Sequence, residues 1–255
     1  MTKRAGRLAQ SPVFEWTIWE TGRLGRAHAG SNPGFLSDHS LSLFFLAIFL
    51  ASLVGQAIAG HILHNEEALA HQGEEMSFWR YLVSSDFGNA VMENWQSEYL
   101  QFMLFMLATI WLIERGSPES KEPGKEGMES DQKQKVGGHA EQDSPAWAKP
   151  RGIKTFVYSN SLLIVMSIIF LGSWFAQSVT GWTEFNAEQT DHGEQTLSWL
   201  SYIGSANFWE ATLQNWQSEF LAVGSFVAIT VFLRQRGSPE SKPVGAPHEA
   251  TGVEG

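Results

Sequence analysis

Two glutamates, Glu98 and Glu219, stand directly before apolar stretches of the chain and are the first candidates for chemistry. Gln56 and Gln177 lie at a similar predicted depth in the apolar stretch that precedes each glutamate. Ionisable side chains inside a membrane are costly and commonly functional, so one interpretation of this intramembrane polar cluster is a pathway for ions or protons. The other is structural, because a helix N-terminus favours a carboxylate, which can also hydrogen-bond to amides of a neighbouring helix. The sequence leaves both interpretations open.

Histidines are the second candidate. His64, Glu67 and His71 share one face of a predicted helix, which is a spacing that can bind a divalent metal. When the surrounding segment recurs later in the chain, only the pair Glu188 and His192 recurs with it. A pair spaced by four residues is commonly an ordinary contact between helical turns. We therefore keep the triad as a weak metal candidate and expect no cofactor.

Motifs of known catalytic sites are missing from the sequence. There is no P-loop, no Gly-x-Ser-x-Gly and no dinucleotide-binding fingerprint. The absence of cysteine excludes disulfides and thiolate chemistry. A net charge of −10 argues against nucleic-acid binding, which needs a basic face. We expect a protein that is not an enzyme and does not bind nucleic acid.

The candidate residues occur in pairs because the chain contains one segment twice. The sequence Asn-Trp-Gln-Ser-Glu at 94–98 recurs at 215–219, and Arg-Gly-Ser-Pro-Glu-Ser-Lys at 115–121 recurs at 236–242. Both motifs recur at the same offset of 121 residues, so the copies align without a gap.

The duplication predicts five parts of the chain. The linker is polar, with almost no apolar residues before Pro150, and we expect it to be disordered, as we do the tail. Aromatic residues of the basic arm, such as Trp16 and Trp19, suit a membrane interface, and a disordered arm is the equal alternative. The parts are a basic N-terminal arm (1–34), repeat 1 (35–121), a cytoplasmic linker (122–155), repeat 2 (156–242) and a tail (243–255).

Four apolar runs, two in each repeat, predict transmembrane helices. The first run of each repeat approaches the roughly 20 residues that cross a bilayer. The second is shorter and spans only if the polar residues before it enter the membrane with it. All four are apolar on every side, unlike a surface helix of a soluble protein. The runs are Leu41–Ala59, Tyr99–Ile113, Leu162–Val179 and Phe220–Leu233.

Basic residues predict the orientation of these spans. Of the 17 Lys and Arg, all except Arg80 lie in the arm, the linker, the tail or the span ends joined to them. Cytoplasmic segments of membrane proteins are enriched in Lys and Arg. We therefore predict a multi-pass protein of the bacterial inner membrane with both termini in the cytoplasm. The predicted fold class is all-α, with four transmembrane helices arranged as two parallel two-helix repeats.

The two outer connections are acidic, nearly forty residues long and rich in aromatic residues. The segments Ser77–Leu82 and Ser198–Ile203 predict short interfacial helices on the outer side. On the inner side, Gly116 and Gly237 suit helix C-caps, which favours a structural role for the Arg-Gly-Ser-Pro-Glu-Ser-Lys motifs. The polar and aromatic residues shared by both outer connections form a candidate outer-face motif: Glu67, His71, Asn94, Trp95, Glu188, His192, Asn215 and Trp216.

The motif Asn-Trp-Gln-Ser-Glu followed by Tyr or Phe and Leu, an apolar run and Arg-Gly-Ser-Pro-Glu-Ser-Lys resembles a known family. It is similar to uncharacterised bacterial integral membrane proteins classed as a domain of unknown function. The similarity covers 35–242 and includes the stretch from Gly181 to Gly193; the first copy departs from the pattern at Gly88 and Asn89. The resemblance implies a membrane location and brings no activity, ligand or catalytic residue.

The sequence thus favours a non-enzymatic membrane protein that acts as a structural or interaction module. Its expected partners are the lipid bilayer, a second copy of itself or other membrane proteins. A small channel or transporter for ions or protons that uses Glu98 and Glu219 is the alternative. A metal-dependent membrane enzyme is the third interpretation.

Overall fold

The computed structural model describes residues 34–255, so the predicted aromatic cluster of the arm lies outside the described residues. Every regular element in this range is a helix and no strand occurs there, which confirms the all-α prediction. The chain divides into two compact units, residues 34–55 and Gln56–Gly255.

The first unit contains α1 (Phe35–Asp38) and the first half of α2 (Ser40–Ala70). His39 lies between the two helices with a backbone conformation that is not helical. Large apolar side chains of this half of α2 are exposed, among them Phe44 at 59% and Phe45 at 60%.

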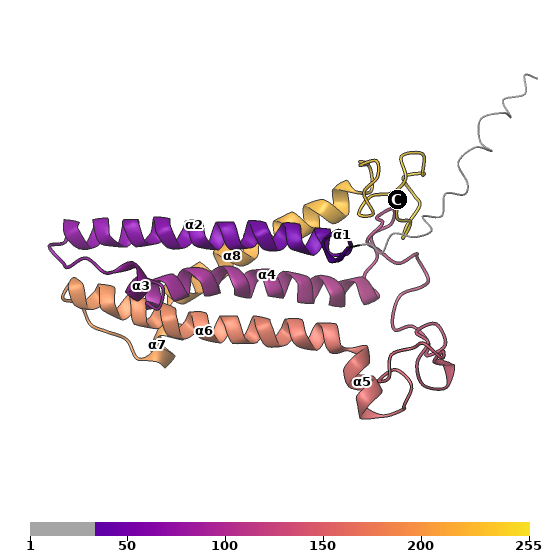
Figure 1. Cartoon of the computed structure of the whole chain (residues 1–255), viewed down its shortest axis with the longest axis horizontal. Helices are drawn as coiled ribbons and strands as arrows, with labels where there is room; N and C mark the ends of the chain where they lie inside the picture. The colour runs from indigo at the N-terminus through magenta and orange to yellow at the C-terminus, as the bar shows by residue number, and fades with distance from the viewer. Residues whose placement is uncertain (1–33) are drawn as a thin grey trace, which may run out of the picture. The chain divides into compact units, whose positions relative to one another are not determined.

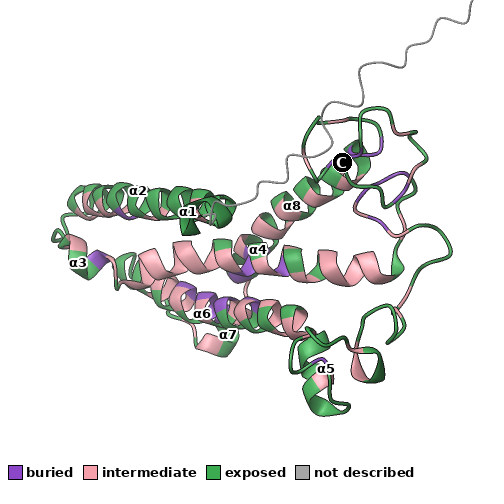
Figure 2. Cartoon of the chain, turned by 45° about the vertical axis from the view of Figure 1, so that its right-hand side comes forward, coloured by how far each residue is buried: buried purple, intermediate pink, exposed green. Residues whose placement is uncertain are grey.

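The second unit holds the rest of α2 and the remaining elements (Figure 1). Within it α4 packs against both α6 and α8, and the short helix α7 packs against α6 and α8. Buried residues lie along α4 and α6 and in the loops near the C-terminus, as Figure 2 shows. The elements that follow α2 are α3 (Phe78–Tyr81), α4 (Ser85–Trp111), η1 (Gly137–His139), α5 (Ile153–Ser159), α6 (Ser161–Asp191), α7 (Trp199–Ile203) and α8 (Ala206–Ile229).

The order of elements repeats with the sequence. Asn160 separates α5 from α6 as His39 separates α1 from α2, with nearly the same backbone angles. The helices α4 and α8 both begin after a serine N-cap, Ser84 and Ser205, whose hydroxyl accepts the backbone N–H three residues on. Short helices α3 and α7 occur where the aromatic segments predict them.

The predicted ends of the long helices need correction. α2 and α6 continue about three turns beyond their apolar runs, because the polar residues that follow contain no proline to stop them. α4 and α8 begin at their serine caps, well before the predicted apolar runs, and end earlier, at Trp111 and Ile229. By length and composition α2 and α6 can cross a membrane.

An asparagine clamp returns the chain after each long first helix. Asn65 accepts the backbone N–H of Met76 over 2.8 Å and donates to its carbonyl over 3.0 Å. Asn186 makes the same two bonds to Leu197, at 2.8 and 2.9 Å. In both copies a ring nitrogen one turn earlier reaches the same carbonyl, from His61 in the first and Trp182 in the second.

In each copy, a tyrosine of the short helix packs against a glycine of the long helix before it. The buried hydroxyl of Tyr81 lies on Gly60, and that of Tyr202 lies on Gly181. A Cβ atom at Gly181 would be 2.5 Å from the Tyr202 hydroxyl, which is shorter than any normal contact. Glycine is therefore required at these positions for close packing.

We predict opposite effects for two alanine substitutions in α6. Gly181→Ala should lower the melting temperature in detergent, by the equivalent of about 1–3 kcal/mol, because Tyr202 is buried and cannot move aside. Gly172→Ala is the matched control, since nothing lies within 4 Å of its added Cβ. It should be neutral or stabilising by up to about 1 kcal/mol, because alanine favours the helix. Equal effects of the two substitutions would contradict the packing described.

Candidate functional site

Five polar side chains gather in the second unit where α6 is packed by α4 and α7. We call them the buried polar cluster, and they come from three different helices. The cluster consists of Asn89 and Glu93 on α4, Gln177 and Glu184 on α6, and Tyr202 on α7.

The amide of Asn89 connects the two carboxylates of the cluster. Its Nδ2 donates to Glu93 Oε1 over 3.0 Å and also lies within hydrogen-bonding reach of Glu184. Gln177 reaches Glu93 from the facing helix. Gly181 leaves space for this arrangement, because an added Cβ would lie 2.9 Å from Asn89 Oδ1.

Three oxygen atoms of the cluster are buried and accept no hydrogen bond. They are Asn89 Oδ1, Gln177 Oε1 and Glu184 Oε2. Gln177 is only 1% exposed, so solvent does not replace the missing partner. Buried polar atoms are nearly always hydrogen-bonded in folded proteins, and leaving one without a partner costs about 1–3 kcal/mol. A group of such atoms therefore marks a place where a further ligand can be bound.

Negative charges accumulate around the cluster without a basic partner. Glu184 lies one turn beyond the apolar part of α6, and its burial, together with Asp86 and Glu93, raises its pKa to about 7. Burial raises the pKa of Tyr202 to about 12, with Glu93 and Glu184 adding to the effect. None of the ion pairs formed within residues 34–255 involves Glu93 or Glu184.

The predicted intramembrane polar cluster is divided by the structure. Glu98 is exposed, and its carboxylate lies close enough to the half-buried Glu219 to repel it. Gln56 is exposed, whereas Gln177 is buried and joins Glu93. We expected Gln177 to meet Glu219 at the same membrane depth. Gln177 instead contacts Glu93 on α4, because α6 packs against α4 here.

Residues of the candidate outer-face motif have mainly local roles. Asn94 and Asn215 donate to the carbonyls of Ala90 and Ala211, one turn back in their own helices. Glu67 and Glu188 are exposed on α2 and α6, four residues before the exposed His71 and His192. The rings of these two histidines lie 6.2 Å apart.

One tryptophan of the motif connects two helices. Trp216 on α8 donates its indole N–H to Gln96 Oε1 on α4 over 2.7 Å. Gln96 is completely buried, so its Oε1 needs a hydrogen-bond donor, and Trp216 of the other helix supplies it. Trp95 occupies the equivalent position on α4 and is half-buried.

The weak metal candidate is not assembled. His64 Nδ1 is 2.7 Å from the carboxylate of Asp86, while Glu67 and His71 are exposed. In the described part of the chain, no group of three or more His, Asp or Glu side chains is arranged to hold a metal ion.

The Arg-Gly-Ser-Pro-Glu-Ser-Lys motifs form tight turns beyond the helix ends. Gly116 and Gly237 have positive φ angles of 92° and 85°, but they lie several residues after the helices end and are not C-caps as predicted. Ser120 and Ser241 each accept a backbone N–H six residues earlier. These bonds give the motif a structural role.

Lys242 is the most buried charged residue among the described residues. It is 1% exposed, and its ammonium group donates to the carbonyls of Gly116, His248 and Ala250. The equivalent lysine of the first copy, Lys121, donates to the carbonyl of Gly127 over 2.8 Å. The lysine therefore fixes the chain that follows each turn, and in the second copy it also ties the two turns together.

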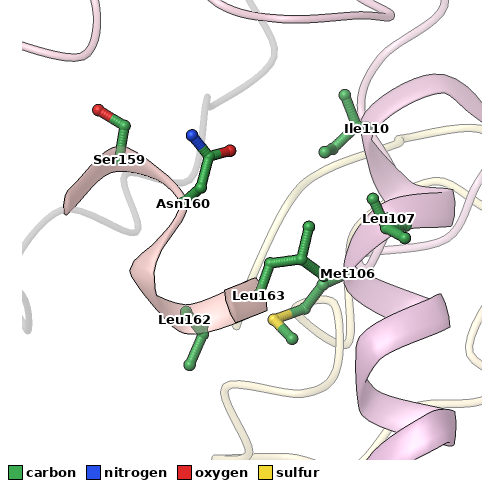
Figure 3. A pocket seen from close by; sticks show the side chains of 7 residues that line it. All are labelled: Met106, Leu107, Ile110, Ser159, Asn160, Leu162 and Leu163. Carbon is green, nitrogen blue, oxygen red and sulfur yellow. The ribbon is translucent and has the colours of Figure 1, made fainter. Parts of the chain in front are cut away.

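A hollow of about 170 Å³ lies at the other end of α4 and α6 (Figure 3). Its walls are mostly apolar, and Asn160, at the junction of α5 and α6, is its main polar side chain. The residues around it are Met106, Leu107, Ile110, Ser159, Asn160, Leu162 and Leu163.

Comparison with known proteins gives a family. The model of a domain of unknown function, DUF6766, matches residues 32–253. The chain belongs to the DUF6766 family. Searches of curated proteins and of solved structures found no match. This family assignment agrees with the resemblance noted from the sequence and attaches no activity to the site.

In this DUF6766 protein, sequence reasoning missed most of the buried polar cluster. From the sequence, Glu93 and Glu184 are only two of the acidic residues of the outer connections. The signal that could have found them is a difference between the copies, since Leu63 and Gln214 occupy the equivalent positions. The residues that both copies share predict Glu98 and Glu219 instead.

We predict that the stability of this DUF6766 protein falls as the pH rises from about 5 to about 8. The pKa of Glu184 in the folded protein, about 7, exceeds its ordinary value of 4.5. Its contribution is therefore fully present below pH 4.5 and is lost as the pH rises through about 7. Melting temperatures of the parent and of Glu184→Gln, measured in a metal-free buffer, should diverge over this range.

The control for this prediction is Glu67→Gln, which removes an exposed carboxylate from α2. It should keep the pH dependence of the parent. If Glu184→Gln also retains the full dependence, the titrating group is a different one.

Proposed function

We propose that the chain is a four-span protein of the bacterial cytoplasmic membrane that acts as a structural or interaction module and not as an enzyme. The single observation that supports this best is the exposure of its apolar helices. Only 6% of the apolar window of α2 and 22% of that of α6 is buried. The core helix of a soluble protein would be mostly buried, so lipid is the environment that suits these surfaces.

Length supports α4 and α8 as the other two spans. With 27 and 24 residues they are about 40 and 36 Å long, at 1.5 Å per residue, and a hydrocarbon core is about 30 Å thick. Their apolar parts are shorter than this. Crossing the membrane would bring in the polar turn that contains Gln96, Ser97 and Glu98, of which the first two are buried. Burial against other helices lowers the cost of placing these groups at membrane depth.

The distribution of Lys and Arg supports an orientation with both termini and the linker in the cytoplasm. In this orientation the asparagine clamps, α3, α7 and the buried polar cluster face the outside. The partners we propose are lipid, a second copy of the chain or other membrane proteins.

A channel or transporter for ions or protons is the second candidate, and one contact favours it. The carboxylates of Glu98 and Glu219 lie near each other where α4 and α8 are in contact. There the side chain of Gln101 donates to the Glu219 carbonyl over 3.1 Å. Two neighbouring acids at membrane depth are the kind of group that moves protons or cations.

We predict the sidedness of single introduced thiols. The chain has no cysteine, so any introduced thiol reports its own position. In intact spheroplasts a membrane-impermeant maleimide should label Glu74→Cys, in the first outer connection, but not Asp131→Cys, in the linker. Both should be labelled after permeabilisation. Labelling of Asp131→Cys in intact cells would overturn the orientation.

We also predict that the double variant Glu98→Gln plus Glu219→Gln distinguishes the two candidate functions. A structural module should show no proton or cation flux in liposomes, and the variant should change only its melting temperature. Flux in the parent that disappears in the variant would support the channel. The single variant Glu188→Gln, which removes an exposed carboxylate, serves as the control and should behave as the parent in both measurements.

A further inference from the structure

The buried polar cluster contains two carboxylates and lacks a counter-charge. Glu93 and Glu184 come from facing helices and share the amide of Asn89. His64 does not balance them, because its Nδ1 lies 2.7 Å from the carboxylate of Asp86. Two acids held together in a buried site need a proton or a cation to balance them.

The unpartnered atoms of the cluster are all oxygens. Asn89 directs its Nδ2 to Glu93, which leaves its Oδ1 over Gly181, beside the hydroxyl of Tyr202. Gln177 is only 1% exposed, and its Oε1 accepts no hydrogen bond. Glu184 Oε2 is also without a partner. Asn89 and Gln177 already direct their N–H groups to the carboxylates, and the oxygens that remain without a partner suit a cation.

The duplication indicates that the fold does not need this cluster. At the equivalent positions of the other copy, Glu184 is replaced by Leu63 and Glu93 by Gln214. The repeat unit therefore forms its helices, clamps and turns with neutral residues in these places. The two carboxylates occur only in the copies of these positions that lie where α4 packs against α6.

We propose that the buried polar cluster binds one Ca²⁺ ion. Ca²⁺ takes six to eight oxygen ligands, including carboxylates, amide carbonyls and water, and tolerates irregular geometry. Glu93 and Glu184 would supply the charge. Asn89 and Gln177 would rotate their amides, which now direct N–H groups to Glu93, and so turn neutral oxygens to the ion. Water would take the remaining positions. With only two carboxylates the site should be weak, with a dissociation constant on the order of 10⁻⁴–10⁻³ M, as in extracellular calcium modules.

Protons compete for the same carboxylates, and other titratable groups face the cluster. Asp86 lies on the same helix as Glu93, Glu188 follows Glu184 on α6, and Glu210 acts on Glu93 from α8. Their negative charge attracts protons and Ca²⁺ alike. Calcium binding should therefore strengthen from pH 5 to pH 8, as the cluster loses its proton.

The test uses the full-length protein in detergent or nanodiscs at pH 8. Adding CaCl₂ should raise the melting temperature in a saturable way, and equilibrium dialysis with ⁴⁵Ca²⁺ should give one ion per chain. MgCl₂, which demands a stricter octahedral geometry, should be less effective. NaCl at equal ionic strength should have almost no effect.

Two variants and one control locate the site. Glu93→Gln and Glu184→Gln should each weaken Ca²⁺ binding at least tenfold. Glu67→Gln, which removes an exposed carboxylate of α2, should bind as the parent does. If either variant fails to fold, luminescence of Tb³⁺ bound to the parent protein, sensitised by Tyr202 and displaced by Ca²⁺, keeps the proposal testable.

Three results would overturn the proposal. The first is no bound Ca²⁺ in dialysis at pH 8, which would leave a shared proton as the only balancing charge. The second is an equal rise of the melting temperature with NaCl, which is ionic screening. The third is unchanged Ca²⁺ affinity in both folded variants, which would place the ion elsewhere. None of these results depends on the orientation or on the number of membrane spans.

Discussion

The asparagine clamps are the interaction on which the rest of the second unit depends. A single side chain, Asn65 or Asn186, satisfies both the N–H and the carbonyl of a residue eleven positions later. The chain therefore turns back at a fixed place after each long helix. The tyrosine of the following short helix can then lie on a glycine of that long helix, and the next serine can cap α4 or α8.

The interior of the helix packing is more polar than its surface. Gln96, Gln177 and Thr212 are at most 1% exposed, whereas large apolar residues such as Phe175, at 61%, face outward. A soluble protein of this kind would be unstable, because hydrophobic burial is the main force that stabilises folding in water. In lipid the situation is reversed: apolar surface faces hydrocarbon, and polar side chains join helices by hydrogen bonds. The bond from Trp216 to Gln96 joins α8 to α4 in this way, in agreement with the proposed membrane location.

The chain contains two similar copies of one segment, and the contacts between the copies are not duplicated. Each copy keeps its own clamp, serine cap and lysine turn, which are short-range features of the unit. The buried polar cluster instead combines the second long helix of one copy with the first of the next. Lys242 likewise reaches from the second turn to Gly116 of the first. The packing of the two copies thus brings together residues that the repeat alone does not specify.

The sequence by itself determined the repeat, the all-helical class, the apolar runs and the short aromatic helices. These follow from local periodicity and composition, which need no knowledge of distant contacts. It also identified Gln177 and Trp216 as special, because both copies carry them. Only the tertiary structure decided what each of them touches. Gln177 meets Glu93 and not Glu219, His64 meets Asp86 and not a metal, and Gly116 serves a turn and not a helix end. The physical reason is that side-chain partners and the protonation of buried acids depend on helix rotation and packing. A rotation of one residue, about 100°, changes every contact while leaving the sequence pattern intact.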